Sequence, residues 1–254
     1  MASLAHYELI AELFDYPQRD YPARLRAVRE ALASRYPLAD DKLASFAKAL
    51  PGEHESLSGK ELDEMQEIFT RSFDVQSITT LSVGYIMFGD DYKRGELMVN
   101  LNREHRDAGV DCGSELSDHL PNVLRLIASW RDQEMVAELV EEILHPALVR
   151  MIEEFDSQRM GQRNKLYEKH FKTLIDSSTL RGAMFRDALE AVVEMLAEDF
   201  RLAERERPEK RSDFLRSIDR ELDIEANEGL PAAQAQPAAE PRIHGHPALV
   251  RRTT

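Results

Sequence analysis

The sequence predicts an all-α protein, and three observations support this prediction. Glycine is scarce, at 11 residues in a chain of 254, and no glycine-punctuated run of alternating strands occurs. Apolar residues recur at helical spacing along most of the chain. Helix caps and proline stops separate these runs. We therefore expect one helical domain over residues 1–205, a charged helical extension over 206–225 and a disordered tail over 226–254.

The first three helices are expected over residues 4–14, 20–36 and 40–50. Pro17 and Pro37 end the first two, because the residue before a proline avoids the α region. Pro22 falls in the first turn of the second helix, where a missing N–H is tolerated. Asp40 begins the third helix, which is short.

A capping box marks the start of the fourth helix, where Ser58 is followed three residues later by Glu61. The segment after this helix is the least polar of the chain and is rich in β-branched residues. A lone strand would also fit there, but no second strand candidate exists to pair with it. We therefore interpret residues 81–88 as a buried helix that Gly89 ends.

The remaining helices are expected over residues 92–108, 115–130, 134–144, 148–155, 166–175 and 180–203. Asp90 and Asp91 cap the first of these, which ends near Gly109. A break is expected near Pro146. From Ala226 the composition changes to Ala, Pro, Gln and Gly. Such a segment buries too little apolar surface to offset its ordering entropy, so we expect disorder.

The formal net charge is −14, which disfavours nucleic acid as a partner because phosphate binding depends on Lys and Arg. It equally disfavours docking on an anionic bilayer. An acidic surface suits a basic partner segment, although solubility alone accounts for the charge more simply. No apolar run approaches the roughly 20 residues that span a bilayer, and the N-terminus lacks a signal-peptide pattern. We expect a cytoplasmic protein without membrane insertion.

The sequence offers little catalytic chemistry. It contains no phosphate-binding glycine loop and no nucleophile elbow. The single cysteine, Cys112, excludes an internal disulfide and a thiolate metal site within one chain. Glu142 and His145 have the i, i+3 spacing of carboxylate-bridged di-iron bundles, but such a site needs two of these pairs and two further glutamates. A solvated helix face is the simpler interpretation, and the metal-binding bundle enzyme stays as an alternative.

The densest polar cluster lies in residues 115–121, Glu-Leu-Ser-Asp-His-Leu-Pro, directly before an apolar helical run. Ser117 could cap that helix and place Asp118 and His119 in its first turn. The same side chains could instead form a recognition site. Local chemistry leaves both interpretations open and slightly favours the cap. Arg94 could likewise pair with Asp90 one turn earlier or bind an anion.

Several short motifs occur in a definite order between residues 69 and 127. They are Phe73-Asp74, Gly89-Asp90, Arg94-Gly95-x-x-Met98-Val99-x-Leu101, Gly109 and Glu115-Leu-Ser-Asp-His-Leu-Pro121. In this order they resemble the nitrate reductase delta-subunit family, the redox-enzyme maturation chaperones that assemble molybdenum enzymes and are related to the trimethylamine N-oxide and dimethyl sulfoxide reductase chaperones. The resemblance covers roughly residues 4–180. Ser117 departs from the family pattern, which has proline there.

The resemblance implies an all-α chaperone without catalytic activity. It would bind the apo catalytic subunit of a molybdenum oxidoreductase, nitrate reductase or a close relative, through the N-terminal segment of that subunit. It would hold the subunit until molybdopterin guanine dinucleotide is inserted. No cofactor is expected to bind stably, although the cofactor carried by the partner could be contacted transiently. A general α-helical adaptor remains the other alternative.

Within this interpretation the expected partner-binding residues are Asp118, His119, Glu115, Pro121, Arg94, Tyr85 and Phe88. Asp118 and His119 would be presented to the partner peptide or to a helix that gates its groove. Arg94 would tie the adjacent helix to this loop by an ion pair, and the flanking residues of the motif would fix the shape of the loop. The two aromatic residues are candidates for lining the groove, with core packing as their simpler role.

Overall fold

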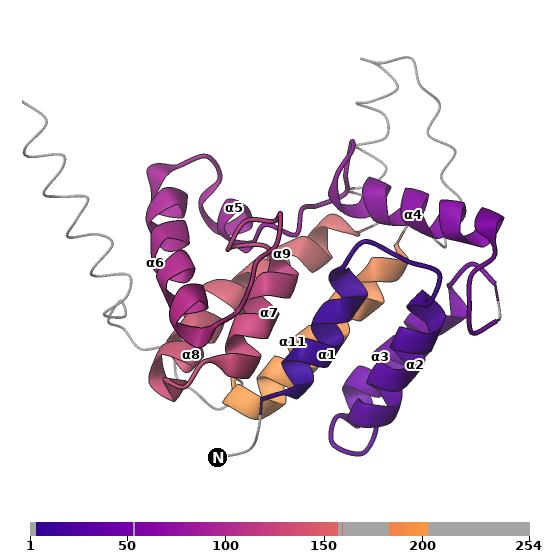
Figure 1. Ribbon diagram of the computed structural model, residues 1–254, viewed down its shortest axis with the longest axis horizontal. Helices are drawn as coiled ribbons and strands as arrows, with labels where there is room; N and C mark the ends of the chain where they lie inside the picture. The colour runs from indigo at the N-terminus through magenta and orange to yellow at the C-terminus, as the bar shows by residue number, and fades with distance from the viewer. Residues whose placement is uncertain (1–3, 53, 157–158, 160–182, 203–254) are drawn as a thin grey trace, which may run out of the picture. The chain divides into compact units, whose positions relative to one another are not determined.

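Helices make up nearly all of the regular structure, which confirms the predicted all-α class (Figure 1). The computed structural model describes residues 4–52, 54–156, 159 and 183–202. All of them fall in the first of two units into which the chain divides, Met1–Ile218, whereas the second, Asp219–Thr254, lies outside the described residues. The helix expected at 166–175, the extension at 206–225 and the tail at 226–254 also lie outside them.

The first half of the described chain contains α1 (His6–Ala11), the 3-10 helix η1 (Glu12–Phe14), α2 (Tyr21–Leu32), α3 (Pro37–Lys48), α4 (Gly59–Phe73) and α5 (Val83–Phe88). The second half contains α6 (Tyr92–Ala108), α7 (Leu120–Ser129), α8 (Gln133–Leu139), the π-helix η2 (Val140–Leu144), α9 (His145–Glu154) and α11 (Met184–Phe200). Among the described residues none of these helices is both long and apolar enough to cross a membrane.

The predicted caps of the middle helices are confirmed. Ser58 and Glu61 form the complete capping box of α4, with the Ser58 amide donating to Glu61 Oε2 over 2.7 Å. Asp91 caps α6 by accepting from the Lys93 amide over 3.0 Å. Gly109 ends α6 with φ +72°, and Gly89 ends α5 with φ +65°, both in the left-handed region that favours glycine.

Two proline predictions were wrong. Pro37 does not end the second helix, which stops at Leu32; it begins α3, three residues before the expected start at Asp40. Proline suits this position because the first amide of a helix has no intrahelical partner. Pro146 causes no break either, since α8, η2 and α9 follow one another without a gap. The π-helical turn of η2 shifts the hydrogen-bond register just before Pro146, which accommodates its missing N–H.

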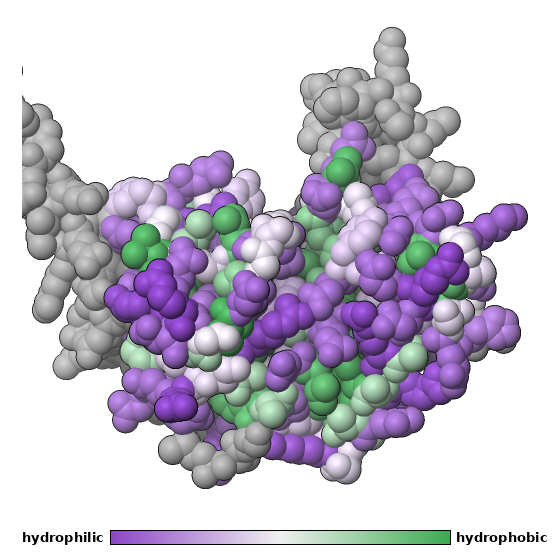
Figure 2. Space-filling view, viewed as in Figure 1, coloured by the Kyte–Doolittle hydropathy of each residue, from purple (hydrophilic) through white to green (hydrophobic). Residues whose placement is uncertain are grey.

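Helix α11 packs against both α3 and α9, and α1 packs against α7. Near the start of α11, the Phe185 ring contacts Phe46, Phe69 and Phe73 at centroid distances of 5.3, 5.5 and 4.9 Å. These rings come from α3 and α4, so one aromatic cluster joins elements distant in sequence. On the face shown in Figure 2, hydrophilic residues dominate and hydrophobic ones gather in small patches.

The far end of α11 is held by a buried carboxylate that sequence reasoning did not single out. The side chain of Asp199 is 3% exposed and receives hydrogen bonds from Tyr36 at 2.8 Å, Tyr7 at 3.1 Å and His6 Nε2 at 2.8 Å. Arg35 supplies an ion pair. Burial by itself would raise the pKa of Asp199, but the hydrogen bonds from His6 and Tyr36 and the nearby charges outweigh it, and the pKa is lowered. This cluster ties α11 to the N-terminal helices.

Candidate functional site

The polar motif at residues 115–121 does not start its helix as expected. Helix α7 begins at Leu120, and His119 occupies the cap position without a capping side-chain hydrogen bond. Ser117 is therefore not the cap. Its hydroxyl donates to the Met98 carbonyl of α6 over 3.3 Å. We call residues 110–119, which join α6 to α7, the motif loop.

Asp118 lies inside the protein rather than on its surface. Its side chain is 0% exposed and forms an ion pair with Arg94, with 2.9 Å between Nε and Oδ2. This confirms the expected tie between α6 and the motif, and Asp118 takes the role that Asp90 was considered for. It also corrects the expectation that Asp118 is presented to a partner, because a fully buried carboxylate cannot contact a peptide at the surface.

The same loop is joined to α5 by backbone hydrogen bonds. The Val83 amide donates to the Asp118 carbonyl and the Leu120 amide donates to the Leu81 carbonyl, both over 2.8 Å. These bonds form an isolated antiparallel bridge between Ser82 and His119. The segment before α5, for which a lone strand was considered, thus forms one short bridge. Within the described residues no sheet forms around it.

Gly84 permits the close approach of α5 to the motif loop. A Cβ atom at this position would lie 2.8 Å from Asp118 Oδ2 and 3.1 Å from Leu97 Cδ2. Real Cβ atoms do not approach a neighbour to 2.8 Å, so a larger residue would push against the ion pair. Sequence reasoning missed this role, because the neighbour that demands glycine is 34 residues away in the chain.

Arg94 links the motif loop to an exposed aromatic ring. Its guanidinium carbon lies 5.5 Å from the centre of the Tyr85 ring, within the range of a cation–π contact. Tyr85 is 42% exposed, so the simpler interpretation as a core residue does not hold for it. Phe88 is half-buried and packs against the core. Of the two aromatic candidates, Tyr85 is the one that lines an open groove.

This groove, which we call the Tyr85 groove, has a volume of about 450 Å³. It is lined by residues 77–80, Tyr85, Ile86, Arg150, Glu153, Glu154 and Arg159. Arg150 donates to the Ile86 carbonyl over 3.2 Å and so fixes the end of α5 on α9. Arg159 forms ion pairs with Glu153 and Glu154 at 3.1 and 2.8 Å. The groove therefore combines apolar side chains with charges of both signs.

The other motif residues occupy different environments. Glu115 is exposed, His119 is half-buried, and Pro121 is buried in the first turn of α7. Burial lowers the pKa of His119, and the opposing effects of Glu115 and Asp118 are smaller. His119 is therefore predominantly neutral at pH 7. Glu115 and His119 can therefore contact a partner at the surface, whereas the buried Pro121 cannot.

Two further side chains hold the motif loop and were not anticipated. His105 is 2% exposed, and its Nε2 lies 3.2 Å from the Ser117 carbonyl. Asn122 donates through Nδ2 to the carbonyls of Cys112 and Leu116 over 3.2 and 3.0 Å. In the sequence, each is a polar residue at a helix position where the spacing of the neighbouring apolar residues predicts burial. This is the signal by which they could have been found. These contacts give the loop carbonyls hydrogen-bond partners and tie the loop to α6 and α7.

Of the residues considered for other chemistry, Cys112 lies within the motif loop, whereas Glu142 and His145 lie in η2 and at the start of α9. Burial raises the pKa of the Cys112 thiol, and Asp111 adds to the effect, so the protonated thiol is favoured over the thiolate. Burial raises the pKa of Glu142 and lowers that of His145. Across the described part of the chain, no group of three or more His, Cys, Asp or Glu residues could hold a metal ion.

Fold and site together define an all-α protein in which a buried ion pair joins α6 to the motif loop beside an open groove. No protein-family model matches the chain, and no curated protein matches it either.

Proposed function

We propose that this protein is an assembly chaperone for the apo catalytic subunit of a molybdenum oxidoreductase, nitrate reductase or a close relative. It would bind the N-terminal segment of that subunit and release it after molybdopterin guanine dinucleotide has been inserted. The ordered motifs at Arg94–Leu101 and at residues 115–121 support this proposal through their resemblance to the nitrate reductase delta-subunit family. The all-α fold is consistent with that resemblance.

One observation carries the proposal beyond the resemblance. The two motifs with the most distinctive sequences meet in the Arg94–Asp118 ion pair, and the arginine also contacts Tyr85 at the edge of the groove. A helix start alone would need neither a buried carboxylate nor a guanidinium to pair with it, because burying two charges is costly. The cost of burying the Arg94–Asp118 ion pair is reasonable if the pair positions a binding surface.

The groove suits a peptide segment. Its volume of about 450 Å³ lies within the range of ligand-binding pockets, roughly 300–1,000 Å³. Tyr85 and Ile86 offer apolar contact, and the hydroxyl and carboxylate groups beside them can accept hydrogen bonds from a peptide backbone or a basic side chain. In this proposal Tyr85 touches the partner, and Arg94 and Asp118 position it.

The surface residues of the motif extend the same site. Glu115 and His119 are the two members of the motif that reach the surface and carry polar side chains. We assign them to contacts with the body of the client subunit. Any contact with the molybdopterin guanine dinucleotide carried by the client would be transient, and the proposed role requires no catalytic residue.

The test is co-expression of the tagged full-length chain with the apo catalytic subunit of a molybdenum enzyme from the same genome, followed by affinity purification. Tyr85→Ala removes the exposed ring of the groove. Leu38→Ala is the matched control, since Leu38 is 62% exposed on α3 and lies outside the groove. We expect the unmodified chain and the Leu38→Ala variant to retain the subunit, and Tyr85→Ala to lose most of it.

Equal recovery with both variants would remove the groove assignment. If the unmodified chain failed to recover any molybdenum subunit and instead recovered an unrelated protein, the general adaptor would replace the chaperone. Circular dichroism of the two variants is the folding control, because neither position belongs to the buried core.

A further inference from the structure

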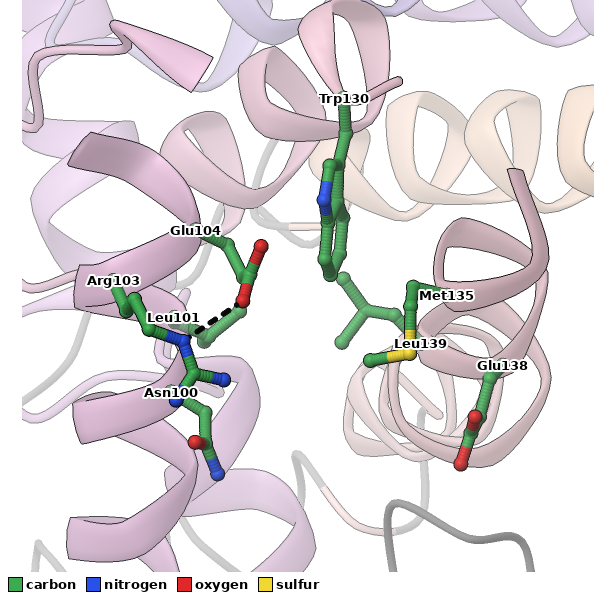
Figure 3. A pocket seen from close by; sticks show the side chains of 8 residues that line it. All are labelled: Asn100, Leu101, Arg103, Glu104, Trp130, Met135, Glu138 and Leu139. Carbon is green, nitrogen blue, oxygen red and sulfur yellow. Dashed lines mark hydrogen bonds and ion pairs between the residues drawn. The ribbon is translucent and has the colours of Figure 1, made fainter. Parts of the chain in front are cut away.

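A second groove lies between α6 and α8, where Trp130 projects from the end of α7. Figure 3 shows the indole between Leu101 and Glu104 of α6 on one side and Met135 and Leu139 of α8 on the other. Trp130 is half-buried, so part of the ring is open to solvent. We call this the Trp130 groove. It is separate from the Tyr85 groove and shares no residue with it.

The size of this groove excludes a small-molecule ligand. Its enclosed space is about 20 Å³, little more than the 10–15 Å³ that one water molecule occupies by the same measure. Pockets that bind organic ligands are roughly an order of magnitude larger. A groove this shallow and mostly apolar is suited to a segment of protein that lies across it and covers the indole.

The α8 side of the groove belongs to an acidic segment of the chain, from which Glu138 lines the groove. From residue 132 to 144 the chain contains no Lys or Arg and five carboxylates, namely Asp132, Glu134, Glu138, Glu141 and Glu142. Burial raises the pKa of Glu142, and the neighbouring charges of Glu138 and Glu141 raise it further. Across the groove, Arg103 already forms an ion pair with Glu104 over 3.1 Å. The matching occupant is therefore a segment with apolar residues flanked by cations.

Residues 210–218, Lys-Arg-Ser-Asp-Phe-Leu-Arg-Ser-Ile, have this composition. On a helix, Arg211, Leu215 and Ile218 would share one face with Phe214. The segment begins eight residues after Leu202, the last residue that the structure describes beyond α11. Eight residues span at most about 29 Å. The carboxyl end of α11 and helix α8 both lie toward the lower edge of the view in Figure 1.

We propose that the Trp130 groove is the docking surface for the chain's own segment 210–218, with its apolar side chains on Trp130 and its cations facing the acidic segment that contains α8. This inference does not depend on the proposed function. A tethered segment needs little intrinsic affinity, because the linker keeps its local concentration high.

The full-length protein supplies its own reporter, because Trp130 is its single tryptophan. The experiment measures acrylamide quenching of Trp130 in three forms of the whole chain. They are the unmodified chain, a Phe214→Ser/Arg211→Glu variant, and the control Ile243→Ser/Arg242→Glu, which likewise replaces one apolar residue and one arginine farther along the chain. We expect the first variant alone to show a red-shifted emission and a higher quenching constant.

A synthetic peptide of residues 210–218 provides the second arm. Added to the Phe214→Ser/Arg211→Glu variant, it should restore the protection of Trp130, and a Glu138→Gln/Glu141→Gln change in that variant should weaken this rescue. Identical quenching in all three chains would overturn the proposal. Protection that depends on protein concentration would overturn it as well, because the occupant would then be a second copy.

Discussion

At the scale of single residues, the Arg94–Asp118 pair is the connection on which the candidate site depends. Removing one partner of a buried ion pair leaves the other charge without compensation, which typically costs about 3–5 kcal/mol. Asp118 is 0% exposed and Arg94 20% exposed in their side chains, so we expect Arg94→Ala to lower the free energy of unfolding by about 3 kcal/mol. Urea denaturation followed by circular dichroism measures this change.

Arg24 supplies the matched control, since it pairs with Asp20 one helical turn away at the same 2.9 Å distance but at the surface. Arg24→Ala should cost less than about 0.5 kcal/mol, as exposed pairs do. If the two arginine variants were equally stable, the Arg94–Asp118 pair would have no structural role.

Two helical glycines allow a second prediction from single residues. Gly84→Ala would place a methyl group 2.8 Å from Asp118 Oδ2, whereas no atom lies within 4 Å of the corresponding position at Gly95. We expect Gly84→Ala to destabilise the fold by about 1–3 kcal/mol through overpacking. Gly95→Ala should stabilise it by about 0.5–1 kcal/mol, because alanine favours the helix. Thermal unfolding of both variants would show shifts of opposite sign, and shifts of the same sign would contradict this packing at α5.

Asp199 gives the stability a defined dependence on pH. Its pKa is lowered in the folded protein, so the folded state favours the ionised carboxylate. This contribution is fully present above the unfolded value of about 3.9, and it is lost as the pH falls through the folded pKa. Asp199→Asn removes it, with an expected cost of about 2 kcal/mol at pH 7.

The measurement is the free energy of unfolding between pH 7 and pH 3 for both chains. The difference between the unmodified chain and Asp199→Asn should shrink toward the acidic end. A difference that stays constant over this range would show that the hydrogen bonds to Asp199 do not depend on its charge.

At the scale of elements, helices with local signals were predictable and those governed by distant contacts were not. The capping box of Ser58 and Glu61 and the helix end at Gly109 depend on residues within one helical turn, so both could be predicted from the sequence. The local signal of Pro37 and of Pro146 is compatible with either of two structures. Proline can end a helix or begin one, and packing decides which.

The cap of α4 provides the prediction at this scale. Ser58→Ala removes the side-chain acceptor for the Glu61 amide and should cost about 1 kcal/mol. Ser56 lies two residues earlier in the same loop and is exposed, so Ser56→Ala is the control and should leave stability unchanged. Chemical denaturation of the two variants separates a specific cap from a general effect of losing a hydroxyl group.

At the scale of the whole molecule, the candidate site could be predicted only in part. The resemblance selected Arg94 and residues 115–121, and the expected ion pair is present. The burial of Asp118 and the roles of Gly84, His105 and Asn122 depend on how α5, α6 and α7 meet, which no local pattern encodes. The Tyr85 groove likewise combines residues from the ranges 77–86 and 150–159, which are distant in sequence. Such a surface exists only after folding.

The central proposal is that this fold recognises a client before its cofactor is present. The most direct measurement is isothermal titration of the full-length chain with the purified catalytic subunit of the molybdenum enzyme, in cofactor-free and cofactor-loaded forms. We expect binding to the cofactor-free subunit and affinity at least about tenfold lower, or 1.4 kcal/mol weaker, for the loaded form. Equal affinity for both forms, or no binding to the cofactor-free subunit, would contradict the proposal.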